Sequence, residues 1–250
     1  MENNQRREFL SSAAMASTVL AATALGTASS DTFAHERNKK HSSHGFEVLK
    51  IDNTALVLVD HQVGTIGWAG ELASEEERNQ LKMWVKVITR FAKSAQMPIV
   101  FTTSLENEAQ GPLLPELKEI APSEYDARIK RFGVINAWDD PAFVDAVRKT
   151  GKKNILMGGL TTDVCLVPPA LSAKSEGLNV VALMDISAAT TRLSAQNSRD
   201  IFDNAKIDMM TVTPMITSIL GNYKNPASKG FFEAMGKEGV FAAYAKGNLR

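Results

Sequence analysis

The sequence predicts an α/β domain in which helices cover both faces of a mainly parallel β-sheet. Several short runs are apolar at consecutive positions, which is typical of strands buried on both faces. Longer segments between these runs repeat apolar residues every three or four positions, as amphipathic helices do. Strands that alternate with helices in this rhythm indicate parallel strands joined by helical crossovers. Together these observations predict a three-layer α/β/α arrangement.

The predicted strands are the short apolar runs in the middle of the chain. The five runs are residues 55–59, 98–102, 154–158, 179–183 and 208–212. The predicted helices lie between or after them, at residues 75–95, 141–150, 164–176 and 194–205. The first of these helices shows the clearest periodicity, with Leu81, Val85 and Ile88 on one face. No fingerprint of the Gly-x-Gly-x-x-Gly type follows the first run, so no dinucleotide site is expected there.

The N-terminal part of the chain differs in composition from the rest. Arg6 and Arg7 precede a mildly apolar, alanine-rich run at residues 12–24, and small residues follow it. This order predicts a twin-arginine signal peptide over residues 1–30 and export to the periplasm. A polar tail that happens to contain two arginines is the alternative. Residues 31–45 are predicted to be a polar linker, and 46–250 the folded domain with a helical C-terminal tail.

Composition excludes several classes of function. The chain has 28 basic and 28 acidic residues, so its zero net charge predicts no nucleic-acid partner, and no membrane partner is expected after signal cleavage. Cys165 is the single cysteine, so no intrachain disulfide can form. His61 is the single histidine after the linker, whereas a histidine-based metal site needs two or three. We therefore expect no metal and no other cofactor.

Reactive side chains follow two of the predicted strands, and a further segment supplies cations. Parallel sheets place their sites at the carboxyl ends of the strands. Asp60 ends the first run, and Cys165 follows the run at 154–158 and begins a predicted helix. A helix start and a nearby cation from residues 127–133 would favour a thiolate, while Asp60 could accept the thiol proton. Each residue type also has a structural explanation: a small core cysteine, a loop-capping carboxylate or a solvated surface cation.

Three motifs taken together resemble one known family. Ala-Leu-Val-Leu-Val-Asp-His-Gln at 55–62, Ile-Asn-Ala-Trp at 135–138 and Gly-Gly-Leu-Thr-Thr-Asp-Val-Cys at 158–165 are similar to the isochorismatase-like cysteine hydrolases. The similarity runs from about residue 52 to about residue 214, and it is strongest to the YcaC-type subgroup. The resemblance implies a Rossmann-like, six-stranded sheet and a catalytic triad of Asp60, Arg131 and Cys165. Many relatives have lysine at the middle position, so Lys130 stays the alternative to Arg131.

The resemblance also implies details around the triad. It implies a cis peptide bond between Leu160 and Thr161, and an oxyanion hole formed by the backbone N–H groups of Thr161 and Cys165. Asn136 and Trp138 would line the substrate pocket, although Trp138 fits a core position equally well. His61 is expected to pack beside the triad rather than to act in catalysis.

The expected function is metal-independent hydrolysis of a carbon–nitrogen bond in a small amide, through a thiolate nucleophile and a covalent intermediate. A small-molecule substrate is the expected partner. A homo-oligomer is expected as well, because the subgroup assembles into rings and the tail carries Phe231, Phe232, Phe241 and Tyr244. One alternative is a non-catalytic member of the fold. Another is an isochorismatase that cleaves a vinyl ether, a reaction that in this family does not need a cysteine. Nicotinamidase is disfavoured, because its metal-binding Asp and His positions are not matched.

Overall fold

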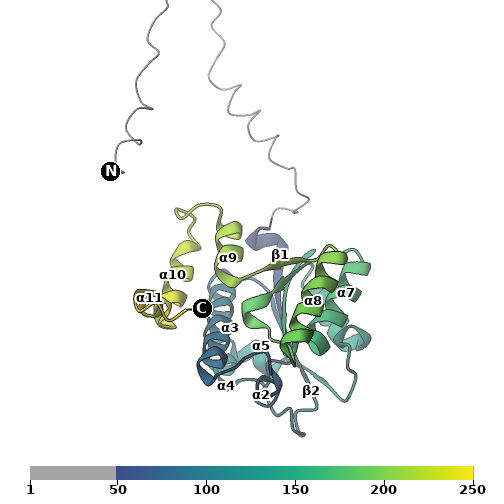
Figure 1. The fold of residues 1–250 in the computed structure, drawn as a ribbon. Helices are drawn as coiled ribbons and strands as arrows, with labels where there is room; N and C mark the ends of the chain where they lie inside the picture. Colours follow the sequence, from purple (N-terminus) through teal and green to yellow (C-terminus); the bar gives the residue numbers. More distant parts are fainter. Residues whose placement is uncertain (1–48, 250) are drawn as a thin grey trace, which may run out of the picture. The chain divides into compact units, whose positions relative to one another are not determined.

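The computed structural model describes residues 49–249, which form a three-layer α/β/α domain (Figure 1). The predicted signal peptide, the linker and the first residues of the predicted domain lie outside the described residues. The strands are β1 Thr54–Val59, β2 Ile99–Ser104, β3 Ile129–Arg131, β4 Asn154–Gly159, β5 Asn179–Leu183 and β6 Asp208–Met210. The longer helices are α3 Glu75–Ser94, α6 Pro141–Lys149, α7 Val167–Ser175, α8 Arg192–Asn204, α9 Val212–Leu220 and α10 Ser228–Lys237. Shorter elements are η1 Ile51–Asn53, α2 Thr65–Trp68, α4 Pro115–Ile120, α5 Pro122–Asp126, η2 Ala137–Asp139, η3 Thr162–Leu166, η4 Met184–Ile186 and α11 Val240–Ala245.

All six strands form one parallel sheet, in the order β3-β2-β1-β4-β5-β6. The predicted fold class and the six strands are therefore confirmed. Five of the strands lie at the predicted apolar runs. The last of them, β6, is shorter than predicted and ends at Met210, because Val212 already begins α9. β3 comes from the cationic stretch at 127–133, which has no apolar run because β3 is an edge strand with partly exposed positions.

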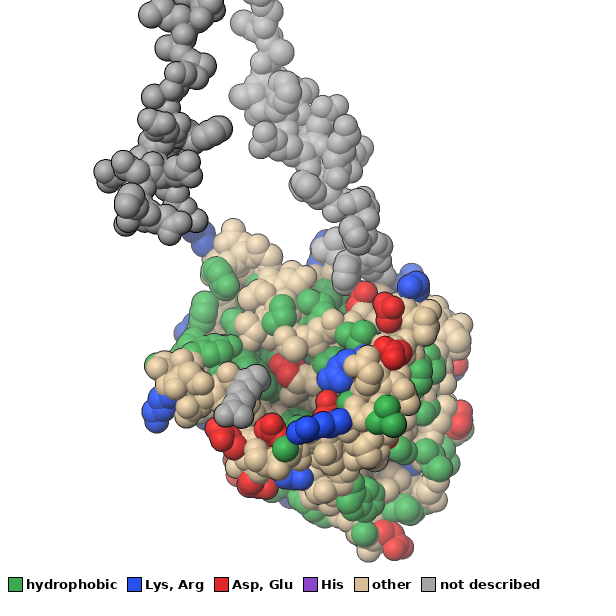
Figure 2. All heavy atoms as spheres, viewed as in Figure 1, with side chains coloured by type: hydrophobic (Ala, Val, Ile, Leu, Met, Phe, Trp, Pro, Cys, Tyr) green, Lys and Arg blue, Asp and Glu red, His purple; other side chains and the backbone are tan. Residues whose placement is uncertain are grey.

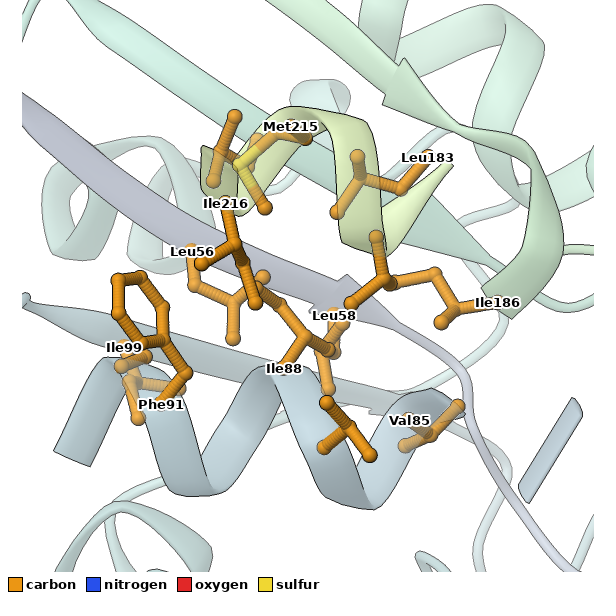
Figure 3. Close-up of a cluster of buried hydrophobic side chains, with 14 of the residues drawn as sticks. Leu56, Leu58, Val85, Ile88, Phe91, Ile99, Leu183, Ile186, Met215 and Ile216 are labelled. Carbon is orange, nitrogen blue, oxygen red and sulfur yellow. The ribbon is translucent and has the colours of Figure 1, made fainter. Parts of the chain in front are cut away.

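The central strand β1 divides its side chains between two hydrophobic cores. Leu56 and Leu58 face α3 and α9, together with Ile88, Phe91 and Ile216 (Figure 3). The alternate residues Ala55, Val57 and Val59 belong to the core on the opposite face, under α6, α7 and α8. This period of two is the geometry of a strand, and burial of both sets explains why the sequence reads as a continuous apolar run.

Helix α3 shows how local sequence signals set the element boundaries. The Ser74 side chain accepts a hydrogen bond from the backbone N–H of Glu77, and the Glu77 carboxylate accepts one from the Ser74 N–H, which makes a capping box. Leu81, Val85 and Ile88 are buried against the sheet. The observed end at Ser94 lies one residue before the predicted end.

The C-terminal helices cover the outer side of α3, as Figure 1 shows. Phe231 of α10 is buried and meets Phe91 of α3 edge to face, with ring centroids 6.3 Å apart. Its neighbour Phe232 is 43% exposed and stacks on Phe241, whose exposed fraction is 47%. The predicted helical tail therefore packs on its own domain through one aromatic ring and leaves others in solvent.

The described surface is mixed in charge. On the face seen in Figure 2, acidic and basic side chains are interspersed among polar and apolar ones. Within residues 49–249, none of the helices combines the length and hydropathy that crossing a membrane requires.

Candidate active site

Strand order brings the three predicted site residues to one edge of the sheet. β1 lies between β2 and β4, and β3 lies beyond β2. Asp60 directly follows β1, Arg131 is the last residue of β3, and Cys165 lies in the turn after β4. Asp60 is therefore central, with the guanidinium arriving from one side and the thiol from the other. We call this group the Asp60–Arg131–Cys165 cluster.

The backbone of Asp60 is held in a left-handed conformation, with φ of 57°. Its N–H donates to the carbonyl of Thr102 on β2 at 3.0 Å, and its carbonyl accepts from the hydroxyl of Thr65 at 2.7 Å. Few non-glycine residues adopt this conformation, and those that do are frequently held by their surroundings at functional sites. These bonds turn the chain so that the carboxylate is buried and pairs with Arg131.

Arg131 reaches Asp60 by crossing β2, and its side chain is fully buried. Its Nε donates to the hydroxyl of Thr102 at 3.1 Å, and its Nη2 donates to Oδ2 of Asp60. Its Nη1 donates to the carbonyl oxygens of Val134 and, at 3.0 Å, Ile135. Gly133, with φ of 105°, makes the reversal that presents these carbonyls. The guanidinium therefore fixes both the Asp60 carboxylate and the loop after β3.

Lys130 has a different environment. Its side chain is 53% exposed, and its ammonium lies 3.4 Å from Glu106, which Arg128 also binds. The structure therefore places Arg131, and not Lys130, against Asp60. The alternation of side chains along an extended segment separates the two neighbours, as the sequence predicted.

Cys165 lies in a π-helical turn, η3, rather than at the start of an ordinary helix. The predicted helix start at residue 164 is wrong: α7 begins at Val167, with prolines in its first turn. Gly159 permits the turn to pack closely, because a Cβ there would lie 2.9 Å from the Cβ of Leu166. Cys165 is partly exposed at this position.

The electrostatic environment of Cys165 differs from the expectation of a stabilised thiolate. Burial raises the pKa of the Cys165 thiol, and the neighbouring Asp60 carboxylate raises that pKa further. The backbone N–H of Thr161 and the charge of Arg131 lower it, but by less. Burial also raises the pKa of Asp60, against the opposing effect of Arg131. The guanidinium, the carboxyl group and the thiol thus share the site, and the raised pKa favours the protonated form of the thiol.

The predicted oxyanion hole is half represented in the structure. The Leu160–Thr161 peptide bond is cis, and the backbone of Thr161 lowers the pKa of the Cys165 thiol. The N–H of Cys165, however, donates to the carbonyl of Thr161 at 2.7 Å. The participation of both N–H groups stays a prediction.

The two predicted pocket residues, Asn136 and Trp138, have contacts with η2 and α7. The side-chain oxygen of Asn136 accepts from the N–H of Trp138, and its amide nitrogen donates to Asp139 and Ser172. Trp138 is buried in the core under α6 and α7, and its indole N–H donates to Glu176 at 2.9 Å. Pocket lining by Asn136 and Trp138 stays a prediction, because the contacts of both side chains are those of packing and capping.

His61 is fully buried, and burial lowers its pKa to about 4. Its Nε2 lies 2.8 Å from the carbonyl of Ile186, which can only accept, so Nε2 carries the proton. The neutral imidazole of His61 therefore connects the end of β1 to η4 through this hydrogen bond. This contact agrees with a role in packing.

Replacing Asp60 by Asn should shift the alkylation of Cys165 to lower pH while reducing any turnover. The Asp60 carboxylate raises the pKa of the thiol, so its removal lowers that pKa, whereas the amide cannot take the thiol proton. The measurement is the second-order rate of iodoacetamide reaction between pH 6 and 10. The control is Asp145→Asn, at an exposed position of α6. An unchanged or higher alkylation midpoint in the Asp60 variant would contradict the assignment.

Sequence reasoning did not identify Thr102, whose hydroxyl orients Arg131. The available signal was the run of three polar residues at 102–104, which ends a strand that begins with apolar residues. Among residues 49–249, no group of three or more His, Cys, Asp or Glu side chains is arranged to hold a metal ion. Surface hollows of about 440 and 370 Å³ beside α3 and α10 are lined by no residue of the cluster.

Comparison with known proteins places this geometry in a family. Residues 54–213 match the isochorismatase domain. The probable hydrolase YcaC of Escherichia coli is 36% identical over 160 residues, which are 64% of this chain and 74% of that protein. A structure of YcaC from Pseudomonas aeruginosa, with hexane-2,5-diol and covalent acrylamide, has a TM-score of 0.72 and 31% identity, covering 82% of this chain and 96% of the other. The E. coli YcaC structure, described as an octameric hydrolase of unknown specificity, has a TM-score of 0.72 and 29% identity, covering 82% and 99%. The chain therefore belongs to the isochorismatase family of hydrolases.

Proposed function

We propose that this protein hydrolyses a carbon–nitrogen bond in a small amide, with Cys165 as nucleophile and without a metal ion. The observation that carries the proposal is the position of the Asp60 carboxylate, which pairs with the Arg131 guanidinium and raises the pKa of the neighbouring Cys165 thiol. A carboxylate placed between a buried cation and a thiol is the arrangement of a general base beside its nucleophile.

The chemistry follows from where the proton rests. Asp60 removes the proton from Cys165 as the sulfur attacks the amide carbon, and the N–H of Thr161 stabilises the developing oxyanion. The protonated Asp60 then returns the proton to the leaving nitrogen, and the C–N bond breaks to leave a thioester. Water attacks the thioester and gives a proton to Asp60; the C–S bond breaks, Asp60 returns that proton to the Cys165 sulfur, and the carboxylic acid is released. Arg131 keeps the Asp60 carboxylate in place throughout, through the hydrogen bond from its Nη2 to Oδ2.

The surroundings of the cluster favour an uncharged substrate. Phe132 and Ile135, in the loop held by Arg131, are 88% and 67% exposed, and Val164 beside Cys165 is 41% exposed. Charged neighbours are already paired: Arg128 and Lys130 with Glu106. An apolar rim with paired charges suits a neutral amide better than a substrate that carries a carboxylate. The P. aeruginosa YcaC structure contains covalent acrylamide, a small neutral molecule whose alkene reacts with thiols.

The test is a screen of purified protein against neutral amides, carboxylate-bearing amides, ureides and isochorismate, with Cys165→Ala alongside. We expect turnover of neutral amides that is lost in the Ala variant and unaffected by a chelator. Hydrolysis of isochorismate that survives in the Ala variant would instead support the vinyl-ether reaction. The absence of any Cys165-dependent turnover would favour the non-catalytic alternative.

We also propose that the protein is a homo-oligomer. The E. coli YcaC structure is described as octameric, and this chain aligns with 99% of it. Tyr223, Phe232, Phe241 and Tyr244 leave an exposed aromatic surface next to α10 and α11, each with an exposed fraction between 43% and 66%. We expect light scattering at micromolar concentration to give a multiple of the chain mass. A monomer mass would refute this proposal.

Export by the twin-arginine route is proposed for the N-terminal segment. The Arg6–Arg7 pair, the apolar run and the small residues occur in the order that this signal requires. Replacing both arginines by lysine keeps the charge but should leave the protein in the cytoplasm, because the route reads the arginine pair itself. Cell fractionation measures the distribution, and an unchanged periplasmic yield would contradict the signal assignment.

A further inference from the structure

Asp163 anchors the turn that carries Cys165. One oxygen of its carboxylate accepts the backbone N–H of Thr190 at 3.1 Å, and the other accepts the Thr190 hydroxyl. These bonds, with a further one from Thr161, lower the pKa of Asp163 despite its partial burial, so the carboxylate is ionised at neutral pH. Two hydrogen bonds from a single neighbour define where the middle of the turn lies.

Backbone contacts join the same two segments. The N–H of Thr162 donates to the carbonyl of Ala188 at 2.9 Å, and the N–H of Gly159 donates to the hydroxyl of Ser187 at 3.0 Å. The segment 187–190, which follows η4, thus runs beside the turn and contacts its beginning and its middle.

The segment 187–190 is itself supported from another part of the chain. Glu71, in the loop between α2 and α3, accepts the N–H of Ala189 at 2.8 Å and donates its own N–H to the Ala189 carbonyl at 3.1 Å. Arg199 of α8 lies 3.2 Å from the Glu71 carboxylate. The Glu71 carboxylate accepts the N–H of Ala189, and the Asp163 carboxylate accepts the N–H of Thr190. The segment 187–190 is therefore held between Glu71 and Asp163.

We propose that Asp163, acting through Thr190, is a positioning residue that keeps the sulfur of Cys165 against the Asp60 carboxylate. The Cys165 N–H donates to the Thr161 carbonyl at 2.7 Å, so residues 161 and 165 move together when the turn moves. Asp163 lies between them in the chain, and its hydrogen bonds to Thr190 fix the position of the turn. This inference rests on the proposed thiol chemistry.

The experiment compares Asp163→Ala, Asp163→Asn and Thr190→Val with the parent protein. The readouts are kcat, KM and the pH profile of Cys165 alkylation by iodoacetamide. For Asp163→Ala we expect kcat to fall by about ten- to a hundredfold with KM changed by less than about threefold, the range for a displaced reacting group or a lost supporting bond. The alkylation profile should move to lower pH, because the sulfur leaves the Asp60 carboxylate.

The other variants separate position from charge. Asn can still accept the Thr190 N–H, so Asp163→Asn should retain most activity, and Thr190→Val, which loses one bond, should be intermediate. The double variant Asp163→Ala/Thr190→Val should be no worse than Asp163→Ala alone, as coupled partners require. If Asp163→Asn lowers kcat as much as Asp163→Ala does, the charge of Asp163 is what matters. If Asp163→Ala keeps the parental kcat and alkylation profile, Asp163 has no role in positioning Cys165. Either result overturns the proposal.

The matched control is Glu238→Ala. Glu238 is a carboxylate with two partners, Lys86 and Arg90 of α3, and it lies just after α10 rather than at the sheet edge with Cys165. Its loss should lower the melting temperature without changing kcat or the alkylation profile, and an equal loss of kcat would assign the Asp163 effect to general destabilisation. Alkylation needs only a folded chain and Cys165, so it decides the matter even if the proposed amide substrate is wrong.

Discussion

Replacing Cys165 by serine should reduce amide turnover by at least about a thousandfold, which is the scale of losing a covalent nucleophile. Burial and the Asp60 carboxylate already make the thiol harder to ionise than usual, and a serine hydroxyl is a far weaker acid still. Asp60, a weak base, could not remove its proton. Serine nearly matches the volume of cysteine, so the turn η3 should keep its conformation.

The measurement is steady-state turnover of the parent, Cys165→Ser and Cys165→Ala on the best amide from the screen. Because Cys165 is the single cysteine, both variants should also lose all labelling by iodoacetamide. Circular dichroism and melting temperature control for folding. Turnover within tenfold of the parent in both variants would exclude Cys165 as the nucleophile.

Replacing Arg131 by alanine should lower turnover by at least about a hundredfold, the effect of removing one well-placed electrostatic group. The same change leaves the buried Asp60 carboxylate without its cation and removes the bonds that hold the loop after β3. Breaking a buried ion pair by removing one partner costs about 3–5 kcal/mol of unfolding free energy. We therefore expect the largest loss of stability at this position.

Lys130→Ala is the matched control, because the two cations are adjacent and Lys130 contacts Glu106 at the surface. Lys130→Ala should have little effect on turnover or on the midpoint of urea-induced unfolding, which measures the stability of each variant. If Arg131→Ala does not fold, Arg131→Lys keeps a charge beside Asp60 but loses most of the hydrogen bonds of the guanidinium, and it should still lower turnover. A large effect of Lys130→Ala with a small effect of the Arg131 variants would move the catalytic cation by one residue.

The parallel α/β fold was predictable because its signals are local. A strand that is buried on both faces is mostly apolar, so β1, β2, β4 and β5 can be recognised in the sequence as short apolar runs. Capping residues similarly mark the start of α3. The edge strand β3 could not be recognised in the sequence, because it is short, partly exposed and made mostly of basic residues.

The residue types at the site were also visible in the sequence, since an Asp and a Cys each follow a predicted strand. Their convergence was not, because it depends on a strand order in which β1 lies between β2 and β4. The same order explains why Arg131 must cross β2, and why Thr102 meets it there.

By itself, the sequence determined the fold class, the elements that end in reactive groups, and the family resemblance. The tertiary structure decided which cation meets Asp60, and it reversed the expected shift in the pKa of Cys165. It also showed that Asp163 is bonded to Thr190, 27 residues away. Burial, neighbouring charge and hydrogen-bond partners are set by segments remote in sequence, so a local pattern cannot carry them.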